Sequence, residues 1–427
     1  MKQYYRVVNI CSASGFFALP NTSTYLVAKY TLESFSDFLR DEMTPWVLYI
    51  SIIESSALKT FMSEVYASIL QDVRKQLSTD IQQRWGIDFS NNLITQEYLG
   101  CIRPLLIGFI IILYVSYRLY QHFYPTPNIS PNGKYILISG CDTGFGHGLA
   151  IELDRQGFNV LAGVFSPDNI SSLQKELSSR ATVFRLDITK QDDIDAAFEL
   201  VKEKTQVLHG LVNNAGISIS GYVDWMSMES LHKVMDVNFF GHVGMTKKFL
   251  PLLIAKRDSR VVNICSVAGY LALSNMTAYC ASKYALESFS DCLRREMVPW
   301  GLRVSIIEPG FMRTKIIEGD GRSFSDFWQN LSTDVQERWG EDFTKARLVA
   351  ARNNLFLKHA EDPMKVVRAL QHAVANTMPH IRYRPGWQSS MIFFPLSMLP
   401  AWSVDWFFGK LMKSTLAPAS ISKQHKE

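Results

Sequence analysis

The chain has 427 residues, of which 44 are lysine or arginine and 40 are aspartate or glutamate, so its formal net charge is only +4. A charge this small for the length argues against a polybasic protein that binds nucleic acid, and we expect no nucleic acid partner. Hydrophobic residues make up 47% of the chain and charged residues 20%. That composition supplies a large core and is too apolar for a disordered chain.

The beginning of the chain is a partial copy of a later part. Residues 6–89 align without a gap on residues 260–343, and roughly half of the aligned positions are identical, including RVVNICS, LESFSD, SIIE and LSTD. The copy holds two strand patterns on either side of a helix pattern, so on its own it has unpaired sheet edges. We interpret residues 1–98 as a partial duplicate that does not fold independently.

A hydrophobic segment at residues 99–124 follows the copy. Its residues 104–117 carry no charge and are flanked by Arg103 and Arg118. A helix between the two arginines rises about 22 Å, against about 30 Å for the hydrocarbon core, so it spans a bilayer only if both arginines reach outward. We expect a membrane anchor here, with a shallow anchor and a buried core helix as the alternatives.

The cysteines show no pattern of a metal site. None of the six forms a CxxC pair, and Cys11 and Cys265 occupy the same position in the two copies. Neither a zinc site nor a disulfide framework is indicated, and we expect no metal.

From Lys134 onward, short β-branched runs alternate with longer helical stretches. The runs are KYILIS, NVLAGVF, ATVFRLD, LHGLVNN, RVVNICS and LRVSIIE. This alternation predicts an α/β fold with a doubly wound parallel sheet of the Rossmann type and helices on both faces. The first run ends in a turn that contains Gly140, Gly144 and Gly146. Glycines there let backbone N–H groups approach a pyrophosphate, although an ordinary strand-to-helix loop has the same composition.

Four motifs follow one another in order: the glycine turn, NNAG at residues 213–216, Ser266, and YxxxK formed by Tyr279 and Lys283. Together they resemble the short-chain dehydrogenase/reductase family over about residues 134–384. Within it, GCDTGFGHGLA and YRPGW are most similar to the membrane-associated retinol, hydroxysteroid and D-β-hydroxybutyrate dehydrogenases. The chain departs from the family at Ser139, where threonine is usual, and keeps a hydroxyl there. The resemblance implies a catalytic domain at residues 131–386.

The catalytic residues are expected to be Ser266, Tyr279, Lys283 and Asn238. Tyr279 and Lys283 are four residues apart, so they share one face of a helix. A phenol with a pKa of about 10 needs roughly 4 kcal/mol of stabilisation to act as a base near pH 7, which the Lys283 ammonium and a positive nicotinamide ring can supply together. Ser266 can bond the substrate oxygen, and the resemblance implies that Asn238 organises a proton relay behind Lys283. We predict reversible oxidation of an alcohol to a carbonyl.

The resemblance also implies a set of cofactor-binding residues. In it, Asp187 holds the adenine, Thr314 contacts the nicotinamide carboxamide, and the NNAG turn lines the cleft. The full set is Gly140, Gly144, Phe145, Gly146, Asp187, Asn213, Ala215, Gly216, Tyr279, Lys283, Pro309, Gly310 and Thr314.

Charge indicates NAD as the cofactor, with NADP as the alternative. A 2′-phosphate needs a nearby cation, but residues 157–174 contain no lysine or arginine, and Thr143 stands where NADP-dependent members often have a basic residue. The usual NAD aspartate would fall near Val164, which is apolar. Asp168 is a nearby substitute, unless it is simply a solvated loop acid.

The first copy repeats the catalytic residues without a nucleotide site. Its counterparts are Ser12, Tyr25 and Lys29. No glycine turn or NNAG precedes them, and Ser55 and Ser56 replace Pro309 and Gly310. We expect this copy to be catalytically inert. A tandem-gene fusion or a wrongly assigned gene start would explain its presence better than selection for a second active site.

Residues 387–427 are rich in Phe, Trp, Leu and Met but are interrupted by Pro395, Pro400 and Asp405. They cannot form a regular transmembrane helix. We expect them to cover the substrate pocket or to dip into a membrane, with core packing as the alternative. A lipophilic retinoid or hydroxysteroid-like substrate is therefore preferred. The second choice is a small hydroxy acid, which would need a cation in the pocket, and the sequence assigns none.

The cellular location and the oligomeric state of the protein are expected from one sequon and from the family resemblance. A glycan at the Asn275 sequon would crowd Tyr279, so we expect a cytosol-facing domain at the endoplasmic reticulum membrane, with the mitochondrial inner membrane second. The helix CASKYALESFSDCLRREM is similar to the family's subunit interface, which implies a homo-oligomer. A non-catalytic scaffold that binds lipid or nucleotide is the competing hypothesis, and the intact catalytic residues favour an enzyme.

Overall fold

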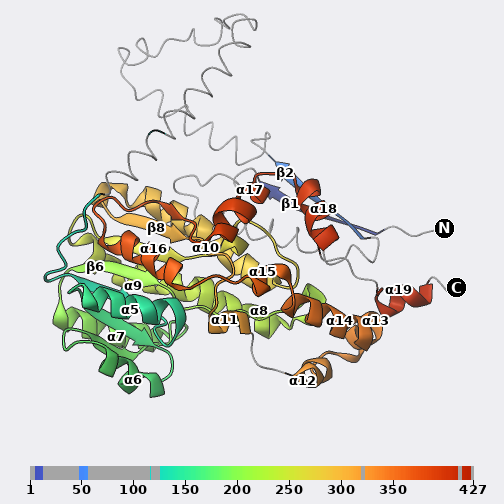
Figure 1. Cartoon of the computed structure of the whole chain (residues 1–427), viewed down its shortest axis with the longest axis horizontal. Coiled ribbons are helices and arrows are strands. Elements are labelled where there is room, and N and C mark those ends of the chain that lie inside the picture. Colours follow the sequence, from blue (N-terminus) through green and yellow to red (C-terminus); the bar gives the residue numbers. More distant parts are fainter. Residues whose placement is uncertain are drawn as a thin grey trace, which may run out of the picture. The chain divides into compact units, whose positions relative to one another are not determined.

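The computed structural model describes residues 5–12, 48–55, 116, 126–318, 323–411 and 416–424. The chain divides into two units, one formed by Met1–Glu54 with Asn128–Glu427 and the other by Ser55–Pro127. Most of the described residues belong to the first unit (Figure 1). Apart from Ser116, the predicted anchor at residues 99–124 lies outside the described residues, as do Tyr25 and Lys29.

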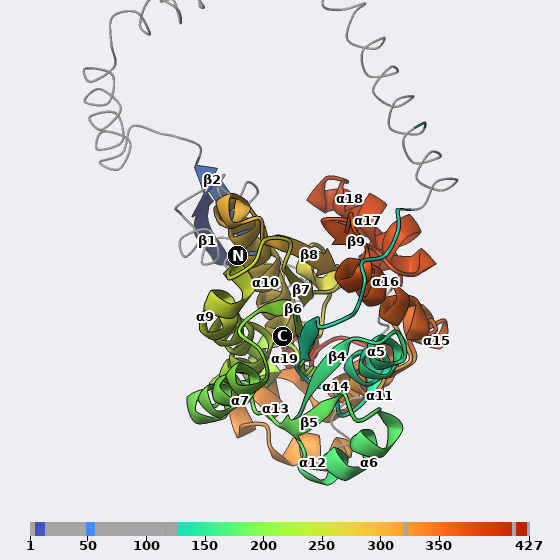
Figure 2. The ribbon, with the colours of Figure 1, turned by 90° about the vertical axis from the view of Figure 1, so that its left-hand side faces the viewer.

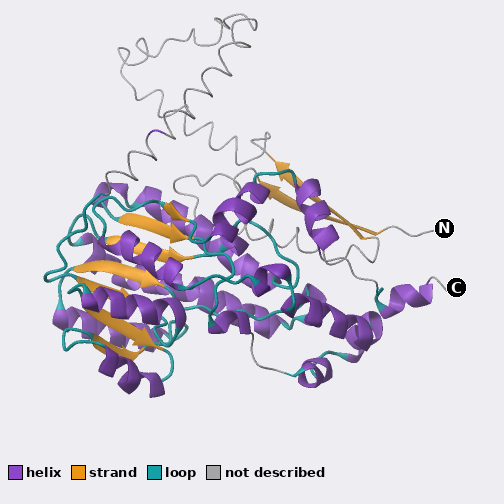
Figure 3. Cartoon of the chain, viewed as in Figure 1, coloured by secondary structure: helices purple, strands orange, loops and turns teal. Residues whose placement is uncertain are grey.

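Seven parallel strands form the central sheet. They are β3 (Tyr135–Ile138), β4 (Asn159–Val164), β5 (Thr182–Arg185), β6 (Leu208–Asn213), β7 (Arg260–Ile264), β8 (Arg303–Ile307) and β9 (Arg382–Tyr383). Their order is β5-β4-β3-β6-β7-β8-β9, the strand order of a doubly wound fold. Figure 3 shows strands in orange and helices in purple. The six predicted strands are confirmed. Strand β9 was not predicted, because its two residues are too short to form a periodic pattern.

Helices cover both faces of the sheet. On one face lie α5 (Gly144–Arg155), α6 (Asp168–Glu176) and α16 (Met364–Ala375), and on the other lie α7 (Gln191–Lys204), α9 (Gly241–Ile254) and α10 (Thr277–Glu296) (Figure 2). Every residue of β7 is buried. The consecutive residues Val261 and Val262 of this strand belong to the hydrophobic cores on opposite faces of the sheet. Alternating side-chain direction along a strand sends a continuous apolar run into both cores at once.

Two further strands lie at the strand patterns of the N-terminal copy. They are β1 (Tyr5–Ser12) and β2 (Leu48–Ser55), and they pair in a two-stranded sheet of their own.

The chain after β8 builds helices beyond the sheet. They are α11 (Lys315–Glu318), α12 (Phe324–Gln329), α13 (Thr333–Trp339), α14 (Glu341–Arg352), α15 (Leu355–Lys358), α17 (Phe394–Ser397), α18 (Ala401–Leu411) and α19 (Ala419–Gln424). The C-terminal segment breaks between α17 and α18 at Pro400, as its prolines predicted. Within the described ranges, no helix combines the length and the apolar character needed to cross a bilayer.

Candidate active site

Ser266 lies two residues after the end of β7, at the edge of the sheet where the parallel strands end. The backbone N–H groups on either side of it donate to the β8 side of the sheet, Cys265 to the Ile307 carbonyl at 2.9 Å and Val267 to the Pro309 carbonyl at 3.0 Å. Its hydroxyl accepts from the N–H of Ala268 at 3.2 Å. The serine is therefore held by its backbone on both sides, with its hydroxyl beside the cavity described below.

Lys283 is buried within α10 close to Ser266. Its Nζ donates to the carbonyl of Ile264, the last residue of β7, at 2.7 Å. It also lies 5.6 Å from the centroid of the Tyr279 ring. Burial lowers the pKa of Lys283 to about 8, because an ammonium is less well solvated there than in water. The predicted pairing of Tyr279 with Lys283 on one helix face is confirmed.

Tyr279 needs a positive charge nearby to become a base. Burial raises the pKa of its phenol, and a hydrogen bond with Ser266 works in the opposite direction. A desolvated phenol gives up its proton near neutral pH only if the phenolate is stabilised electrostatically. The ammonium of Lys283 is the cation positioned to do this.

Asn238 lies in a π-helical turn, η5 (Asp236–Phe240), and is fully buried. Its side chain accepts from the N–H of Ile217 and donates to the Ile217 carbonyl, both at 2.9 Å, and it donates to Ser282 Oγ at 3.0 Å. It thus clamps the segment after the NNAG turn against the residue that precedes Lys283. The predicted relay role of Asn238 stays a prediction.

A buried ionic cluster lies behind the catalytic residues. Arg382 of β9 pairs with Glu287 of α10, with Glu308, and with Asp291 at 2.8 Å. Burial raises the pKa of Glu287, while the neighbouring Arg382 guanidinium opposes that shift. Glu287 is one helical turn beyond Lys283, and its charge favours the ammonium form of that lysine. The cluster joins α10 to the β8 and β9 edge of the sheet.

The glycine turn and the NNAG turn are packed directly against each other. Gly140 has φ +70°, and an added Cβ would lie 2.7 Å from the Cα of Ala215. Ser139 Oγ accepts from the N–H groups of Asn214 and Ala215 at 3.1 and 3.2 Å. The Asn214 side chain donates to the Gly140 carbonyl at 2.8 Å. This close approach fits a dinucleotide cradle, since a side chain at residue 140 would force the turns apart.

One cavity of about 2040 Å³ connects these elements. The predicted residues that line it are Gly140, Gly144, Phe145, Asp187, Ala215, Gly216, Ser266, Tyr279, Lys283, Pro309, Gly310 and Thr314. Gly146, Asn213 and Asn238 are not in its wall. Asn213 instead donates to Thr246 and Asn263 in the core at 3.0 and 2.8 Å, and it is Asn214 that faces the cavity.

Asp142 is a lining residue that the sequence analysis missed. Its carboxylate accepts from the N–H groups of Phe165 and Ser166 at 2.8 and 2.9 Å and from the Asn169 side chain at 2.8 Å. It therefore anchors the loop after β4, where the ribose of a dinucleotide is bound in this fold. Asp168, the substitute considered from sequence, is exposed and absent from the wall. The sequence did contain a signal for this residue, because Asp142 is the acid within the glycine turn, between Gly140 and Gly144.

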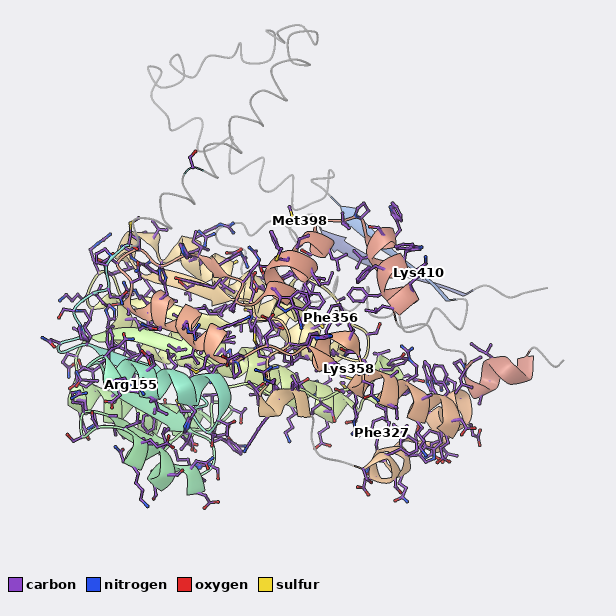
Figure 4. All side chains as sticks on the ribbon, viewed as in Figure 1. Arg155, Phe327, Phe356, Lys358, Met398 and Lys410 are labelled. Atoms are coloured by element: carbon purple, nitrogen blue, oxygen red, sulfur yellow. The ribbon has the colours of Figure 1, made fainter. Side chains whose placement is uncertain are left out.

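The remaining wall of the cavity is largely apolar. It comes from the segment before α10, from the chain after β8 and from the helices beyond, with Phe327 extending from α12 (Figure 4). Apolar lining residues are Ile217, Leu273, Met276, Phe311, Ile316, Ile317, Phe324, Phe327, Leu348 and Leu355. This part of the cavity can surround a hydrocarbon skeleton, while Ser266 and Tyr279 lie in the same cavity to hold a hydroxyl or carbonyl oxygen.

The fold and the site together define a dinucleotide-dependent oxidoreductase. A parallel sheet with a glycine turn at its switch point binds the cofactor. A serine, a tyrosine and a buried lysine placed together can bind an oxygen and move its proton. In the part of the chain that the structure describes, no cluster of His, Cys, Asp or Glu could hold a metal ion.

Comparison with known proteins agrees with this class. The sequence profile of the family described as short chain dehydrogenase matches residues 134–322. Mouse retinol dehydrogenase 5 is 41% identical over 283 residues, covering 65% of this chain and 88% of the mouse protein. The 3beta-hydroxysteroid dehydrogenase of Caenorhabditis elegans is 35% identical over 342 residues, covering 76% and 86%. The chain belongs to the short-chain dehydrogenase family and is an NAD(P)-dependent oxidoreductase acting on CH–OH groups.

A solved structure supports the fold. A short-chain dehydrogenase from Streptomyces avermitilis superposes with a TM-score of 0.53 at 25% identity, covering 67% of this chain and all of that chain. A family member from Burkholderia phymatum, solved in complex with NAD, gives a TM-score of 0.52 at 19% identity, which concerns the fold alone.

The pKa of Lys283 predicts a pH dependence. We expect carbonyl reduction to need a protonated Tyr279 and a charged Lys283, and burial lowers the pKa of Lys283 to about 8. The charge is present below that pH and lost above it, so we expect kcat for reduction to fall as the pH rises through about 8. The measurement is kcat at saturating substrate from about pH 6 to about pH 10. A kcat that stays constant across this range would contradict the assignment of Lys283.

Proposed function

We propose that this protein is a membrane-associated, NAD-dependent dehydrogenase that interconverts the alcohol and carbonyl forms of a lipophilic, retinoid-like or hydroxysteroid-like substrate. The observation that carries the proposal is a single cavity whose wall includes the glycine turn, the Ser266, Tyr279 and Lys283 group and an extensive apolar surface. The retinol and hydroxysteroid dehydrogenases among its relatives support the same substrate class.

The chemistry follows from the positions of the side chains. In the oxidative direction Tyr279 takes the hydroxyl proton of the substrate, and in the reductive direction it returns that proton. Ser266 holds the same oxygen, and Lys283 stabilises the phenolate. A nicotinamide bound along the glycine turn would supply the hydride chemistry. Asn238 would keep the segment at Gly216 and Ile217 in place beside Lys283.

The preference for NAD over NADP is supported by Asp142. Its carboxylate lies at the loop after β4, and the described residues of that loop bring no cation to the cavity wall. A ribose 2′-phosphate close to this carboxylate would be repelled, whereas a free 2′-hydroxyl can donate to an acid.

Membrane association is supported by the surface of the C-terminal helices. Trp402 and Trp406 lie four residues apart on α18 and are 75% and 61% exposed, and Met398 just before that helix is 73% exposed (Figure 4). Phe408 of the same helix is buried. Exposed tryptophans beside a cation such as Lys410, which lies 4.4 Å from the Trp406 ring centroid, suit a membrane interface. The endoplasmic reticulum membrane remains the proposed location.

The other hypotheses are less well supported. A small hydroxy acid would leave most of the apolar wall without contact, and a non-catalytic scaffold would have no need for a buried Lys283 that can stabilise a phenolate. The homo-oligomer implied by the resemblance of α10 to the family's subunit interface remains part of the proposal.

The central test compares two tyrosines at equivalent positions of the two copies. We expect Tyr279→Phe to abolish turnover of retinol and of hydroxysteroids, because the proton-transferring phenol is lost, and Tyr25→Phe to leave it unchanged. The measurement is the formation of reduced nicotinamide by detergent-solubilised full-length protein, with thermal unfolding as the check on folding. Comparable losses in both variants, or full activity of Tyr279→Phe, would refute the assignment.

Cofactor choice is tested at Asp142. We expect kcat/KM to be at least about 100-fold higher with NAD than with NADP, and Asp142→Asn to reduce this ratio about tenfold, because repulsion of the 2′-phosphate is removed. The exposed Asp168→Asn is the matched control and should keep the wild-type ratio. A wild-type preference for NADP would overturn the proposal for the cofactor.

The membrane surface is tested by fluorescence quenching in vesicles whose acyl chains carry bromine. We expect the double variant Trp402→Phe, Trp406→Phe to lose most of the quenching of the wild type, because these rings enter the acyl region. Trp300→Phe serves as the control, since Trp300 is 51% exposed in the short helical turn η7 (Val298–Trp300) that follows α10. If the control loses as much quenching as the double variant, α18 is not the contact surface.

A further inference from the structure

The outer face of α16 carries two cations. In this helix Val366, Val367 and Leu370 are buried, whereas Lys365 and Arg368 are exposed. Residues three apart lie on the same face of a helix, so the two cations are neighbours on the outer surface. In the described part of the chain, Arg368 makes neither a hydrogen bond nor an ion pair. Its charge is therefore available to a ligand.

The turn after β9 is folded over the buried carboxylate of Glu361. This carboxylate accepts from the backbone N–H groups of Trp387 at 3.2 Å and Gln388 at 3.1 Å, and it pairs with Lys365 at 2.6 Å. Gly386 has φ +92°, and a Cβ added there would overlap Oε1 of Glu361. Only glycine lets the backbone come this close. The turn therefore holds Trp387 beside the cations of α16.

Arg384 brings a third cation to the same place. Its Nε lies 2.7 Å from Oε2 of the buried Glu308, and its guanidinium carbon lies 3.6 Å from the centroid of the Phe394 ring. Within the described ranges, its two terminal nitrogens have no hydrogen-bond partner. A guanidinium fixed by one ion pair and by a ring keeps its orientation, while its terminal N–H groups can still donate to a ligand.

The three cations line one cavity of about 560 Å³, which we call the α16 cavity. The acids that pair with Lys365 and Arg384 are almost fully buried and are not in its wall, and no other described acid lines it. The wall therefore presents positive charge to whatever enters. Its complete lining is Lys365, Arg368, Ala369, Tyr383, Arg384, Pro385, Gly386, Trp387, Ser390 and Met391.

Exposed apolar side chains adjoin the α16 cavity. Trp387 and Met391 line it and are exposed, and the exposed Met398, Leu399 and Trp402 follow them along the chain. Helices α16, α17 and α18, which carry or flank these residues, lie close together along one side of the first unit (Figure 2). A cationic cavity beside an exposed apolar surface matches the two parts of a phospholipid, its phosphate and its acyl chains.

The chemistry of the wall indicates which headgroup suits it. The planar donors of an arginine match the oxygens of a phosphate. A zwitterionic headgroup would bring a cation of its own to a wall that already carries three, whereas an anionic headgroup is attracted. A soluble phosphate compound would leave the exposed Trp387 and Met391 in water. A phospholipid with a purely anionic headgroup satisfies both surfaces.

We propose that Lys365, Arg368 and Arg384 bind the phosphate of an anionic phospholipid whose headgroup carries no cation, so that the protein selects this lipid from the bilayer. The inference rests on the proposed membrane association and adds to it a lipid preference and a fixed point of contact. Trp387 and Met391 then lie on the acyl-chain side of the same lipid.

The test reconstitutes the full-length protein in phosphatidylcholine bilayers that contain a minor fraction of phosphatidylglycerol. Acyl chains brominated near the headgroup are carried either by the phosphatidylglycerol or by an equal fraction of the phosphatidylcholine. Quenching of tryptophan fluorescence then gives the relative association constant of the two lipids. We expect it to favour phosphatidylglycerol at least about fivefold, and Arg368→Gln to lower it about fivefold, because each cation near an anionic headgroup contributes about that factor. Arg368→Lys should keep most of the preference.

A matched control separates a local site from the attraction of the whole protein to negative charge. Lys247→Gln removes an exposed cation of α9, which covers the opposite face of the sheet, and should keep the wild-type preference. Equal association of the two lipids with the wild type would overturn the proposal. So would an equal loss of preference in Arg368→Gln and Lys247→Gln, since the attraction would then come from the overall charge.

Binding of a short-chain lipid distinguishes this site from the proposed membrane association. Calorimetric titration of detergent-solubilised protein with dihexanoyl-phosphatidylglycerol needs no bilayer. If no brominated lipid quenches the fluorescence but the short-chain lipid binds the wild type at least about fivefold more tightly than Arg368→Gln, the membrane association is wrong and the phosphate site stands. Equal binding by both proteins refutes the site. If glycerol 3-phosphate binds as tightly as the short-chain lipid, the occupant is a soluble phosphate compound and the lipid assignment is wrong.

Discussion

The active site depends on burying one ammonium group. Lys283 donates to the carbonyl of Ile264 at the end of β7, and this contact fixes α10 across the carboxyl edge of the sheet. An ammonium taken out of water must find compensation, so its surroundings are constrained. The same placement brings Lys283 within 5.6 Å of the Tyr279 ring centroid, close enough to stabilise a phenolate. The buried position that makes the Lys283 ammonium costly is thus the same position that allows it to stabilise a Tyr279 phenolate.

Charged side chains behind the site also compensate for the burial of the Lys283 ammonium. Glu287, one turn beyond Lys283, favours the ammonium form and is itself held by Arg382 from β9. Removing one member of such a cluster leaves an unpaired buried charge. The loss of stability is then much larger than the net stabilisation that the intact cluster provides. The short strand β9 is therefore more than a sheet edge, because it carries Arg382, which balances the acids behind Lys283.

The cavity combines three kinds of surface, each from a different part of the chain. Two turns packed backbone to backbone, at Gly140 and Ala215, form the nucleotide end. An apolar middle section comes from residues around Met276 and from the helices after β8, and a cationic wall comes from α14. A ligand that fills the first two must place a reactive oxygen beside Tyr279 and a hydrocarbon body against the apolar section.

The sequence by itself determined the alternation of strands and helices, the glycine turn and the pairing of Tyr279 with Lys283, because strand periodicity, glycine conformation and helical spacing are local properties. It did not determine that Asn214 rather than Asn213 faces the cavity, since the side-chain direction at the end of β6 depends on how that strand registers with β3 and β7. Asp142 acquires its role only when the loop after β4 folds back onto it. Arg347 meets Tyr222 across 125 positions of the chain, and contacts of that separation are created by tertiary packing alone.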